Sequence, residues 1–257
     1  MNRKILLSFD VEEFDILEEY GEKIDNEVKF EISCRGLKEV VDLLEKLKIQ
    51  ATFFVTANFA IHHQSVIQAI SQKHEIASHS FYHSNFRLED LKKSREALEE
   101  ITNKKVIGFR MPRLQKIDDQ EIVKARYQYN SSMNPTYIPG RYNNFFQPRT
   151  AYYLNSLVNI PASVTPLMRF PLFWLSFKNF PLSLIKLASG VTLRNDNYIS
   201  LYFHSWEFND ISHFRLPKYI TKYSGREMLN RLEKYLVWLK SQGEFICFSE
   251  FYETFRR

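Results

Sequence analysis

Short runs of apolar residues alternate along most of the chain with longer stretches of helical periodicity. The runs are rich in aromatic and β-branched side chains, which suit a buried sheet, and they are bounded by polar residues. They predict strands at 4–9, 51–55, 75–79, 105–110, 127–130, 156–160, 199–204 and 244–249.

Helical periodicity fills several of the intervals. Ser33 is a candidate N-cap for a helix whose apolar face runs from Leu37 to Leu47. Further helices are predicted at 62–71, 88–102 and 118–125, and after a Ser224–Glu227 capping box, with Gly243 ending the last of them. The middle third is less regular: 134–148 reads as a long loop, and 166–181 is an apolar, aromatic segment broken by proline.

Alternating strands and helices predict an α/β protein with a parallel sheet. About seven to eight mostly parallel strands in one stretch favour a distorted (β/α) barrel, with a doubly wound sheet as the alternative. The chain shows no internal repeat and no linker, so we expect a single catalytic domain over residues 1–257.

The composition is that of an ordinary globular protein. The chain has 257 residues, of which 44% are hydrophobic, so it can bury a sizeable core. Its net charge of +5 fits an anionic membrane surface or a phosphorylated substrate, or it is incidental. The cations are dispersed without a basic arm, so nucleic-acid binding is not expected. The sequence does not predict an oligomeric state.

The two cysteines, Cys34 and Cys247, lack the spacing of a zinc ribbon or a redox pair. The first apolar run is too short for a signal peptide, and no run is long enough to span a membrane. We therefore expect a cytoplasmic protein, with the inner face of the membrane as a further location. Segment 166–181 is a candidate for peripheral membrane contact, and packing in the barrel wall is the alternative.

Polar residues occupy four strand ends. Asp10, His79, Arg110 and His204 each stand at or next to the last residue of a predicted strand. In a β/α barrel the carboxyl ends of the strands converge on one face, where active sites form. These four side chains are therefore predicted to be neighbours in space.

His79 and His83 are four residues apart and can face the same way if the chain turns helically after the strand. Imidazole suits zinc, cobalt or nickel, and a catalytic site needs about three protein ligands with an open position for water. The acidic run from Asp10 to Glu13 offers the third ligand. Two structural or surface histidines are the alternative interpretation of this spacing.

Taken together, these motifs resemble the polysaccharide deacetylase family, also called carbohydrate esterase family 4. The family's H-[ST]-x-x-H motif is similar to 79–83, its Arg-x-Pro motif to 110–112, and its L-x-H motif to 201–204. Segment 129–135 looks like a variant of the segment that follows in the family. The motifs occur in the family's order, and the resemblance spans about residues 4–250.

The first motif departs from the family pattern of adjacent aspartates, because this chain has Asp10-Val11-Glu12-Glu13. It resembles a branch with a D-V-E type motif that is linked to exported-polysaccharide synthesis. Asp10 matches the family's general base. Alternation along a strand would place Asp10 and Glu12 on one side, which favours Glu12 as the metal carboxylate over Glu13.

The resemblance implies a mechanism and a set of roles. Glu12, His79 and His83 would hold a divalent metal, most simply zinc, with cobalt or nickel as alternatives. Asp10 would accept the proton of a metal-bound water, Arg110 would orient Asp10 and hold it ionised, and His204 would protonate the leaving amine. Sugar contacts are expected from Tyr82, Pro112, Trp206 and Glu207; a core tryptophan and a surface glutamate are the alternative for the last two.

The implied activity is metal-dependent removal of an N-acetyl group from an acetamido sugar, in a polysaccharide or in a glycan precursor. Two alternatives remain open: an amide or imide hydrolase of the same family that acts on a cyclic amide, and a sugar-binding homologue that has lost catalysis. The altered first motif is what motivates the last of these.

Overall fold

The computed structural model describes residues 3–256. Its first half contains β1 (Lys4–Val11), η1 (Ile16–Tyr20), α1 (Asn26–Leu47), β2 (Thr52–Val55), α2 (Ala57–His62), α3 (Gln64–Ser71), β3 (Glu75–Ser78), α4 (Glu89–Thr102), β4 (Gly108–Phe109), η2 (Pro112–Leu114), α5 (Asp119–Lys124) and β5 (Tyr129–Asn130). The rest comprises β6 (Tyr137–Ile138), β7 (Tyr142–Asn143), β8 (Tyr152–Leu154), β9 (Leu157–Asn159), α6 (Trp174–Asn179), α7 (Leu182–Asp196), β10 (Tyr198–His204), η3 (Ser205–Phe208), α8 (Lys218–Thr221), α9 (Gly225–Lys240), β11 (Glu244–Phe245) and α10 (Phe248–Arg256).

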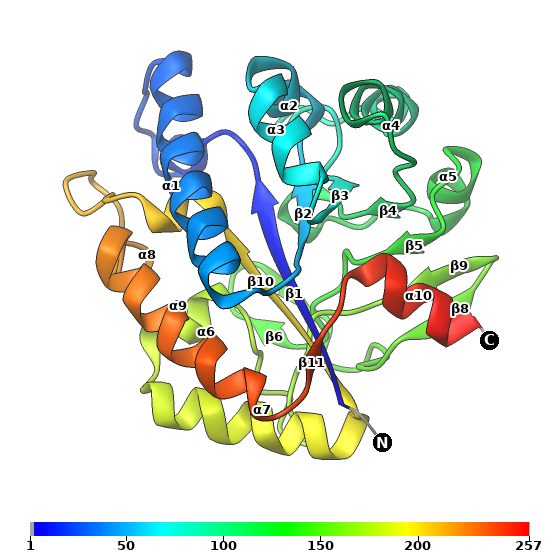
Figure 1. Ribbon diagram of the computed structural model, residues 1–257, viewed down its shortest axis with the longest axis vertical. Coiled ribbons are helices and arrows are strands. Elements are labelled where there is room, and N and C mark those ends of the chain that lie inside the picture. The colour runs from blue at the N-terminus through cyan, green and yellow to red at the C-terminus, as the bar shows by residue number, and fades with distance from the viewer. Residues whose placement is uncertain (1–2, 257) are drawn as a thin grey trace.

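All of these strands except β6 and β7 form one curled sheet in the order β10-β1-β2-β3-β4-β5-β9-β8, and β11 pairs with the start of β1. Every pairing in this sheet is parallel except β8 with β9. Helices surround the strands, as Figure 1 shows for α1 to α4 and for α7 and α9. The predicted α/β fold, a distorted and mostly parallel (β/α) barrel, is confirmed.

The two longest strands lie side by side at one end of the sheet. β1 and β10 are parallel neighbours whose register sets Asp10 opposite His204 at their carboxyl ends. β1 is buried after its first residue, as expected for a strand that is covered on both faces. It also runs to Val11, beyond the predicted end at residue 9, so Asp10 lies inside the strand.

The helix predicted from residue 33 begins seven residues earlier. Asp25 is the N-cap, and its side chain accepts a hydrogen bond from the backbone N–H of Glu27. Ser33 is instead buried within α1. The helix predicted at 62–71 corresponds to α3, and the sequence did not predict α2, which precedes it and ends at His62. Both differences reflect capping that apolar periodicity alone does not locate.

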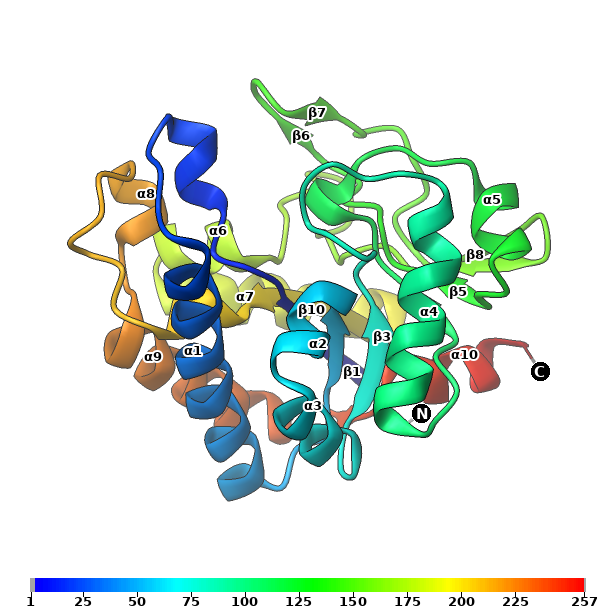
Figure 2. The same ribbon diagram turned by 90° about the horizontal axis from the view of Figure 1, so that it is seen from above.

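The middle third contains more structure than predicted. Segment 134–148 is not only a loop, since β6 and β7 pair as an antiparallel hairpin within it. Figure 2 shows this hairpin standing clear of the helices around the sheet. Segment 166–181 contains α6, whose aromatic side chains Phe173, Trp174 and Phe177 are buried.

The C-terminal region corrects two further predictions. Ser224 occupies the N-cap position of α9 but makes no capping hydrogen bond, and its hydroxyl approaches Asp210 and the N–H of Ile211. The strand predicted at 244–249 stops at Phe245, and residues 248–256 form α10, which packs on the open end of the barrel core. Cys247 is therefore not in a strand and is only partly buried.

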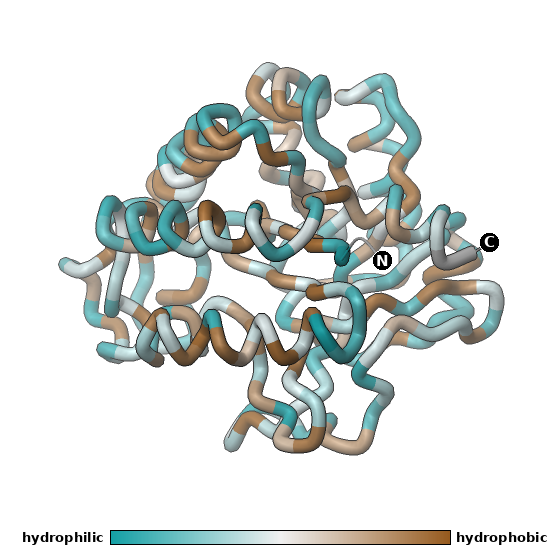
Figure 3. The backbone as a smooth tube through the Cα atoms, turned by 60° about the horizontal axis from the view of Figure 1, so that its bottom comes forward, coloured by the Kyte–Doolittle hydropathy of each residue, from teal (hydrophilic) through white to brown (hydrophobic). Residues whose placement is uncertain are grey.

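The hydrophobic core lies between the sheet and the surrounding helices. Hydrophobic and hydrophilic residues alternate along these helices, as the tube in Figure 3 shows. The buried faces of α1 and α9 pack with β1, β2 and β10 in a continuous apolar cluster. Among the described residues, no helix combines the length and the apolar character needed to cross a membrane.

Candidate metal centre and catalytic pocket

A pocket lies at the carboxyl ends of β1, β3 and β10. It is lined by charged, aromatic and apolar side chains from these strand ends, from η1 and from the β6–β7 hairpin, including Asp10, Glu12, His79, His83, Arg141, Tyr142, Tyr202, His204 and Trp206. Its free volume is about 60 Å³, which is enough for a few atoms. The structure thus brings together the strand-end residues that the sequence placed on one face.

Three of these side chains converge on one point. Glu12 Oε2 lies 3.0 Å from His79 Nε2 and 3.1 Å from His83 Nε2. All three groups are buried, and their candidate ligand atoms lie within 4.8 Å of one another. Two imidazoles and one carboxylate with an open side form a donor set that fits a catalytic divalent metal.

The opposite ring nitrogens are tied to acceptors. His79 Nδ1 is 2.9 Å from the carbonyl oxygen of Arg110, and His83 Nδ1 is 2.8 Å from Asp15 Oδ1. Donation from each Nδ1–H leaves the Nε2 lone pair facing Glu12, which is the tautomer that a metal ligand requires. The hydrogen bonds at Nδ1 therefore orient both imidazole rings so that each Nε2 could bind a metal.

The same contacts shift the pKa values in the metal-free protein. Burial by itself would raise the pKa of Glu12, but the imidazoles around it, His83 foremost, lower that pKa well below its usual range. Burial opposes charge on His83 as well, yet Glu12 and Asp15 outweigh it and raise the pKa of His83 to about 9. A metal bound between these groups would therefore have to displace a proton from His83.

Asp10 and Arg110 form a buried ion pair beside this cluster. Arg110 Nη1 donates to Asp10 Oδ1, and Arg110 is held in turn by the carbonyl and hydroxyl oxygens of Ser131. The guanidinium also stacks on the ring of Phe54, 3.9 Å from its centroid. This anchoring fixes the Asp10 carboxylate and leaves its Oδ2 facing His204 Nε2 at 4.0 Å.

His204 is held from below by a buried carboxylate. Glu207 Oε1 accepts the backbone N–H of His204 at 2.8 Å and lies 3.2 Å from its Nδ1. Glu207 Oε2 is 3.3 Å from Lys178 Nζ, and neither Glu207 nor Lys178 has any exposed surface. Burial would lower the pKa of His204, but the carboxylates of Glu207, Glu12 and Asp10 outweigh it and raise that pKa above its usual value.

The four residues predicted to contact a sugar do not all line the pocket. Trp206 lines the pocket, stacks on His204 and donates from Nε1 to Glu12 Oε1 at 3.2 Å. Glu207 is sealed beneath His204, where its full burial does not fit a direct sugar contact. Pro112 is buried at the start of η2. Tyr82 is exposed, but it lines a neighbouring cleft.

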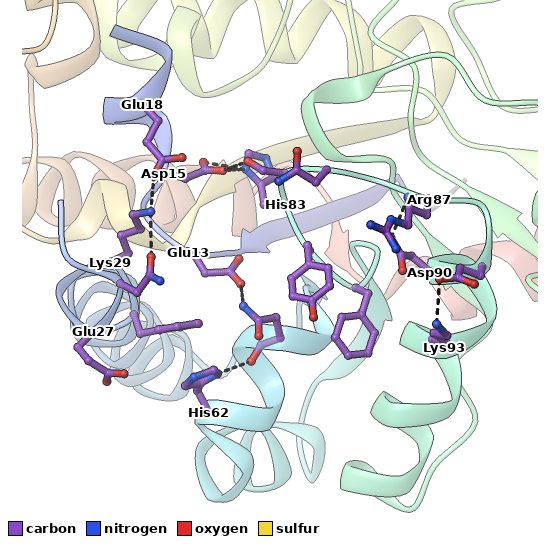
Figure 4. Close-up of a pocket in the computed structure, with 18 residues that line it drawn as sticks. Glu13, Asp15, Glu18, Glu27, Lys29, His62, His83, Arg87, Asp90 and Lys93 are labelled. Atoms are coloured by element: carbon purple, nitrogen blue, oxygen red, sulfur yellow. Dashed lines mark hydrogen bonds and ion pairs between the residues drawn. The ribbon is translucent and has the colours of Figure 1, made fainter. Parts of the chain in front are cut away.

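The two candidate metal carboxylates, Glu12 and Glu13, face different pockets, and Glu13 faces this cleft. The cleft has a volume of about 780 Å³ and lies beyond His83 and Asp15, as Figure 4 shows. Glu13 points into it and accepts hydrogen bonds from Asn58 and Thr56, away from the histidine cluster. The local geometry therefore selects Glu12 rather than Glu13 as the partner of the two imidazoles.

Several residues of the site were not singled out from the sequence. Asp15 bonds to His83 and also contacts Arg113, and its only sequence signal is its place in an acidic run after β1. Tyr142 and Arg141 enter the pocket from the hairpin, which the sequence pattern did not reveal. Lys178 lies within an apolar segment and gave no signal beyond its isolated charge.

Fold and site together define a (β/α)-barrel protein with a buried histidine–histidine–carboxylate cluster at its catalytic face. Residues 35–131 match the family model described as Polysaccharide deacetylase. This stretch carries His79, His83 and Arg110, and the match over this part of the chain agrees with the family that the motifs predicted. No curated protein matches the chain.

Solved structures share the fold at low sequence identity. A protein from Mycobacterium smegmatis described as a polysaccharide deacetylase aligns with a TM-score of 0.67 and 15% identity, over 100% of this chain and 91% of that one. PuuE allantoinase aligns with a TM-score of 0.67 and 14% identity, over 97% and 89%. BA3943, a pseudoenzyme of the CE4 family from Bacillus anthracis, aligns with a TM-score of 0.55 and 14% identity, over 98% and 66%.

Proposed function

We propose that the chain is a metal-dependent hydrolase that removes an N-acetyl group from an acetamido sugar of a polysaccharide or a glycan precursor. The observation that carries the proposal is that one pocket brings together three groups suited to metal binding, to proton acceptance and to proton donation. A cluster suited to a metal (Glu12, His79 and His83) adjoins an anchored carboxylate, Asp10, and an imidazole, His204, whose pKa is raised by the carboxylates around it.

A divalent metal held by Glu12, His79 and His83 would acidify a bound water and polarise the acyl carbonyl. Asp10 Oδ2 is the oxygen placed to accept a proton as general base, because the other oxygen is engaged by Arg110. The burial of Arg110 and its bonds to Ser131 keep this carboxylate in one orientation. The zinc ion is the simplest choice for this donor set, with cobalt or nickel as alternatives.

His204 faces Asp10 across the pocket and is the proton donor to the leaving amine. Its Nδ1 side is held by Glu207, so Nε2 is the nitrogen that faces the reacting atoms. We assign Glu207 and Lys178 a positioning role rather than a sugar contact, since both are sealed from the pocket.

We expect Glu207→Gln to lower kcat about 10- to 100-fold, the size typical of lost outer-shell partners, with KM little changed. The substitution also leaves Lys178 buried without its carboxylate, which costs about 3–5 kcal/mol of stability. The double variant Glu207→Gln/Lys178→Met is the control, because it removes the unpaired charge. It should recover stability but not kcat; recovery of both would mean that Glu207 has only a structural role.

The function is tested by acetate release. The purified chain, loaded with zinc, cobalt or nickel in turn, is incubated with N-acetylglucosamine, its oligomers and a nucleotide-linked acetamido sugar. Release above that of the chelator-treated protein supports the proposal. Metal binding without acetate from any of these substrates would favour the sugar-binding alternative.

Hydrolysis of a cyclic amide is a second candidate, and the small pocket is the observation that favours it. A free volume of about 60 Å³ admits a compact ring more readily than a polymer. The fold also aligns with PuuE allantoinase over nearly the whole chain. Turnover of allantoin-like rings, together with no acetate from acetamido sugars, would decide for this reaction.

A further inference from the structure

Acidic residues are absent from a long part of the sequence. Between Glu121 and Asp196 the chain has no aspartate or glutamate, while its cations are Lys124, Arg126, Arg141, Arg149, Arg169, Lys178, Lys186 and Arg194. Most of the large apolar side chains that the structure exposes also come from this part, among them Phe146, Leu167, Met168 and Leu187. A basic region with exposed apolar residues is the combination that binds anionic bilayers.

The apolar side chains gather most strongly at one protruding tip, which is formed by residues 145–147 and 166–169. Phe146 is 90% exposed, Leu167 is 91% exposed and Met168 is 84% exposed. Side chains this large are rarely left so free, because each keeps nearly all of its apolar surface in water.

The tip is ordered by specific bonds. Arg169 Nη1 donates to the carbonyl of Gln147 at 2.8 Å, and Arg169 O accepts the hydroxyl of Thr136 at 2.8 Å. Val164 and Pro171 pair as an antiparallel bridge at the base of the 165–170 loop. Leu167 is held there with φ at 62°, a left-handed conformation that is costly for leucine. Strained backbone of this kind occurs often at functional sites.

The positive charge of Arg169 at the tip also favours contact with an anionic bilayer. Arg141 and Arg149 are paired with Glu19 and Asp196, both of which lie outside the acid-free stretch. Arg169 is bonded to carbonyl oxygens and stacks near Phe145, so its positive charge is not compensated by the carboxylates of those pairs. A guanidinium just behind an apolar tip is placed to meet lipid phosphates while the tip enters the interface.

The tip is joined to the catalytic pocket. Thr136, which bonds to Arg169, precedes the β6–β7 hairpin, and the hairpin contributes Ile138, Arg141 and Tyr142 to the pocket wall. We propose that the tip of Phe146, Leu167 and Met168 inserts into an anionic phospholipid surface and holds the pocket mouth beside it. This deepens the proposed function, because it favours a substrate presented at a membrane. The buried aromatics of α6 take no part in the contact.

Co-sedimentation with vesicles tests the proposal without requiring turnover. The wild-type chain is mixed with vesicles of phosphatidylcholine containing phosphatidylglycerol, and with pure phosphatidylcholine as the neutral surface. The variant Phe146→Ser/Leu167→Ser/Met168→Ser removes the tip. The matched control Ile61→Ser/Leu88→Ser/Val237→Ser removes three side chains that are also exposed (43%, 57% and 53%) but lie on other elements.

We expect wild type and the matched control to bind anionic vesicles, and the tip variant to lose at least about tenfold in partition coefficient. Binding should weaken with added salt and on neutral vesicles. As a second readout, Phe146→Trp should show a blue shift of tryptophan emission on anionic vesicles. Absence of wild-type binding, or equal binding by the tip variant, overturns the proposal. Vesicle binding without acetate release would instead count against the deacetylase function alone.

Discussion

Replacing Glu12 with glutamine is expected to remove the bound metal, whereas the same change at Glu13 should leave it in place. Glu12 Oε2 lies about 3 Å from both imidazole Nε2 atoms, while Glu13 is turned to Asn58 and Thr56. An amide is a weaker ligand than a carboxylate, so we expect Glu12→Gln to lose about 100-fold or more in metal affinity, and its activity with it.

Metal content by elemental analysis, after purification without chelator, measures the difference. Wild type and Glu13→Gln should each carry about one zinc, cobalt or nickel ion per chain, and Glu12→Gln should carry much less. The two substitutions are chemically identical and adjacent, so a general loss of stability cannot explain a contrast between them. Metal retained by Glu12→Gln and lost by Glu13→Gln would transfer the ligand role to Glu13.

The affinity of the wild-type protein for its metal should depend on pH, and the direction of this dependence follows from the pKa of His83. In the metal-free protein the pKa of His83 is raised to about 9, so a metal must displace a proton from His83 at lower pH. Apparent metal affinity should therefore rise about tenfold for each pH unit between pH 7 and 9, and level off above it. Affinity that falls as pH rises through this range would contradict the geometry around His83.

Asparagine at position 10 should abolish most of the activity and leave the metal in place. Asp10 is the carboxylate beside the metal cluster whose Oδ2 is not engaged by Arg110. Loss of a positioned general base costs about 10²- to 10⁴-fold in rate. Because Asp10 is not among the three converging ligands, the metal content of Asp10→Asn should equal that of the wild type.

The Asp10 substitution also tests the ion pair. Arg110 would remain buried with its bonds to Ser131 but without its carboxylate, which is expected to lower the free energy of unfolding by about 3–5 kcal/mol. Asp90→Asn is the matched control, since Asp90 is also buried but caps the backbone N–H of Arg87 outside the pocket. The control should keep its kcat. Wild-type kcat in Asp10→Asn would exclude Asp10 as the base.

Much of the barrel could be predicted from the sequence because most strands of the parallel sheet carry their own signal. Segments such as 51–55 and 199–204 are apolar and β-branched, and a strand buried on both faces needs no partner to be recognised. Helix ends were predicted less well. α1 begins at Asn26 because Asp25 caps it, although the apolar periodicity that was recognised begins only near residue 33.

Contacts between distant segments explain most of what was missed. The β6–β7 hairpin has strands of two residues each, too short for an alternating pattern. The end of the chain forms α10 rather than a longer strand, because β11 pairs with only the first two residues of β1. Glu207 shows the same limit in the site: its charge suggested a surface position, and only its bonds to His204 and Lys178 explain its full burial.

The sequence by itself determined the fold class, the family resemblance and the strand-end residues around which the site is built. It could do so because parallel strands bring their carboxyl ends to one face wherever the intervening chain goes. The tertiary structure alone decided which acid faces which base. It set Glu12 rather than Glu13 between the imidazoles, Asp15 behind His83, and Glu207 with Lys178 beneath His204. Such choices depend on side-chain directions across elements far apart in sequence, which no local pattern encodes.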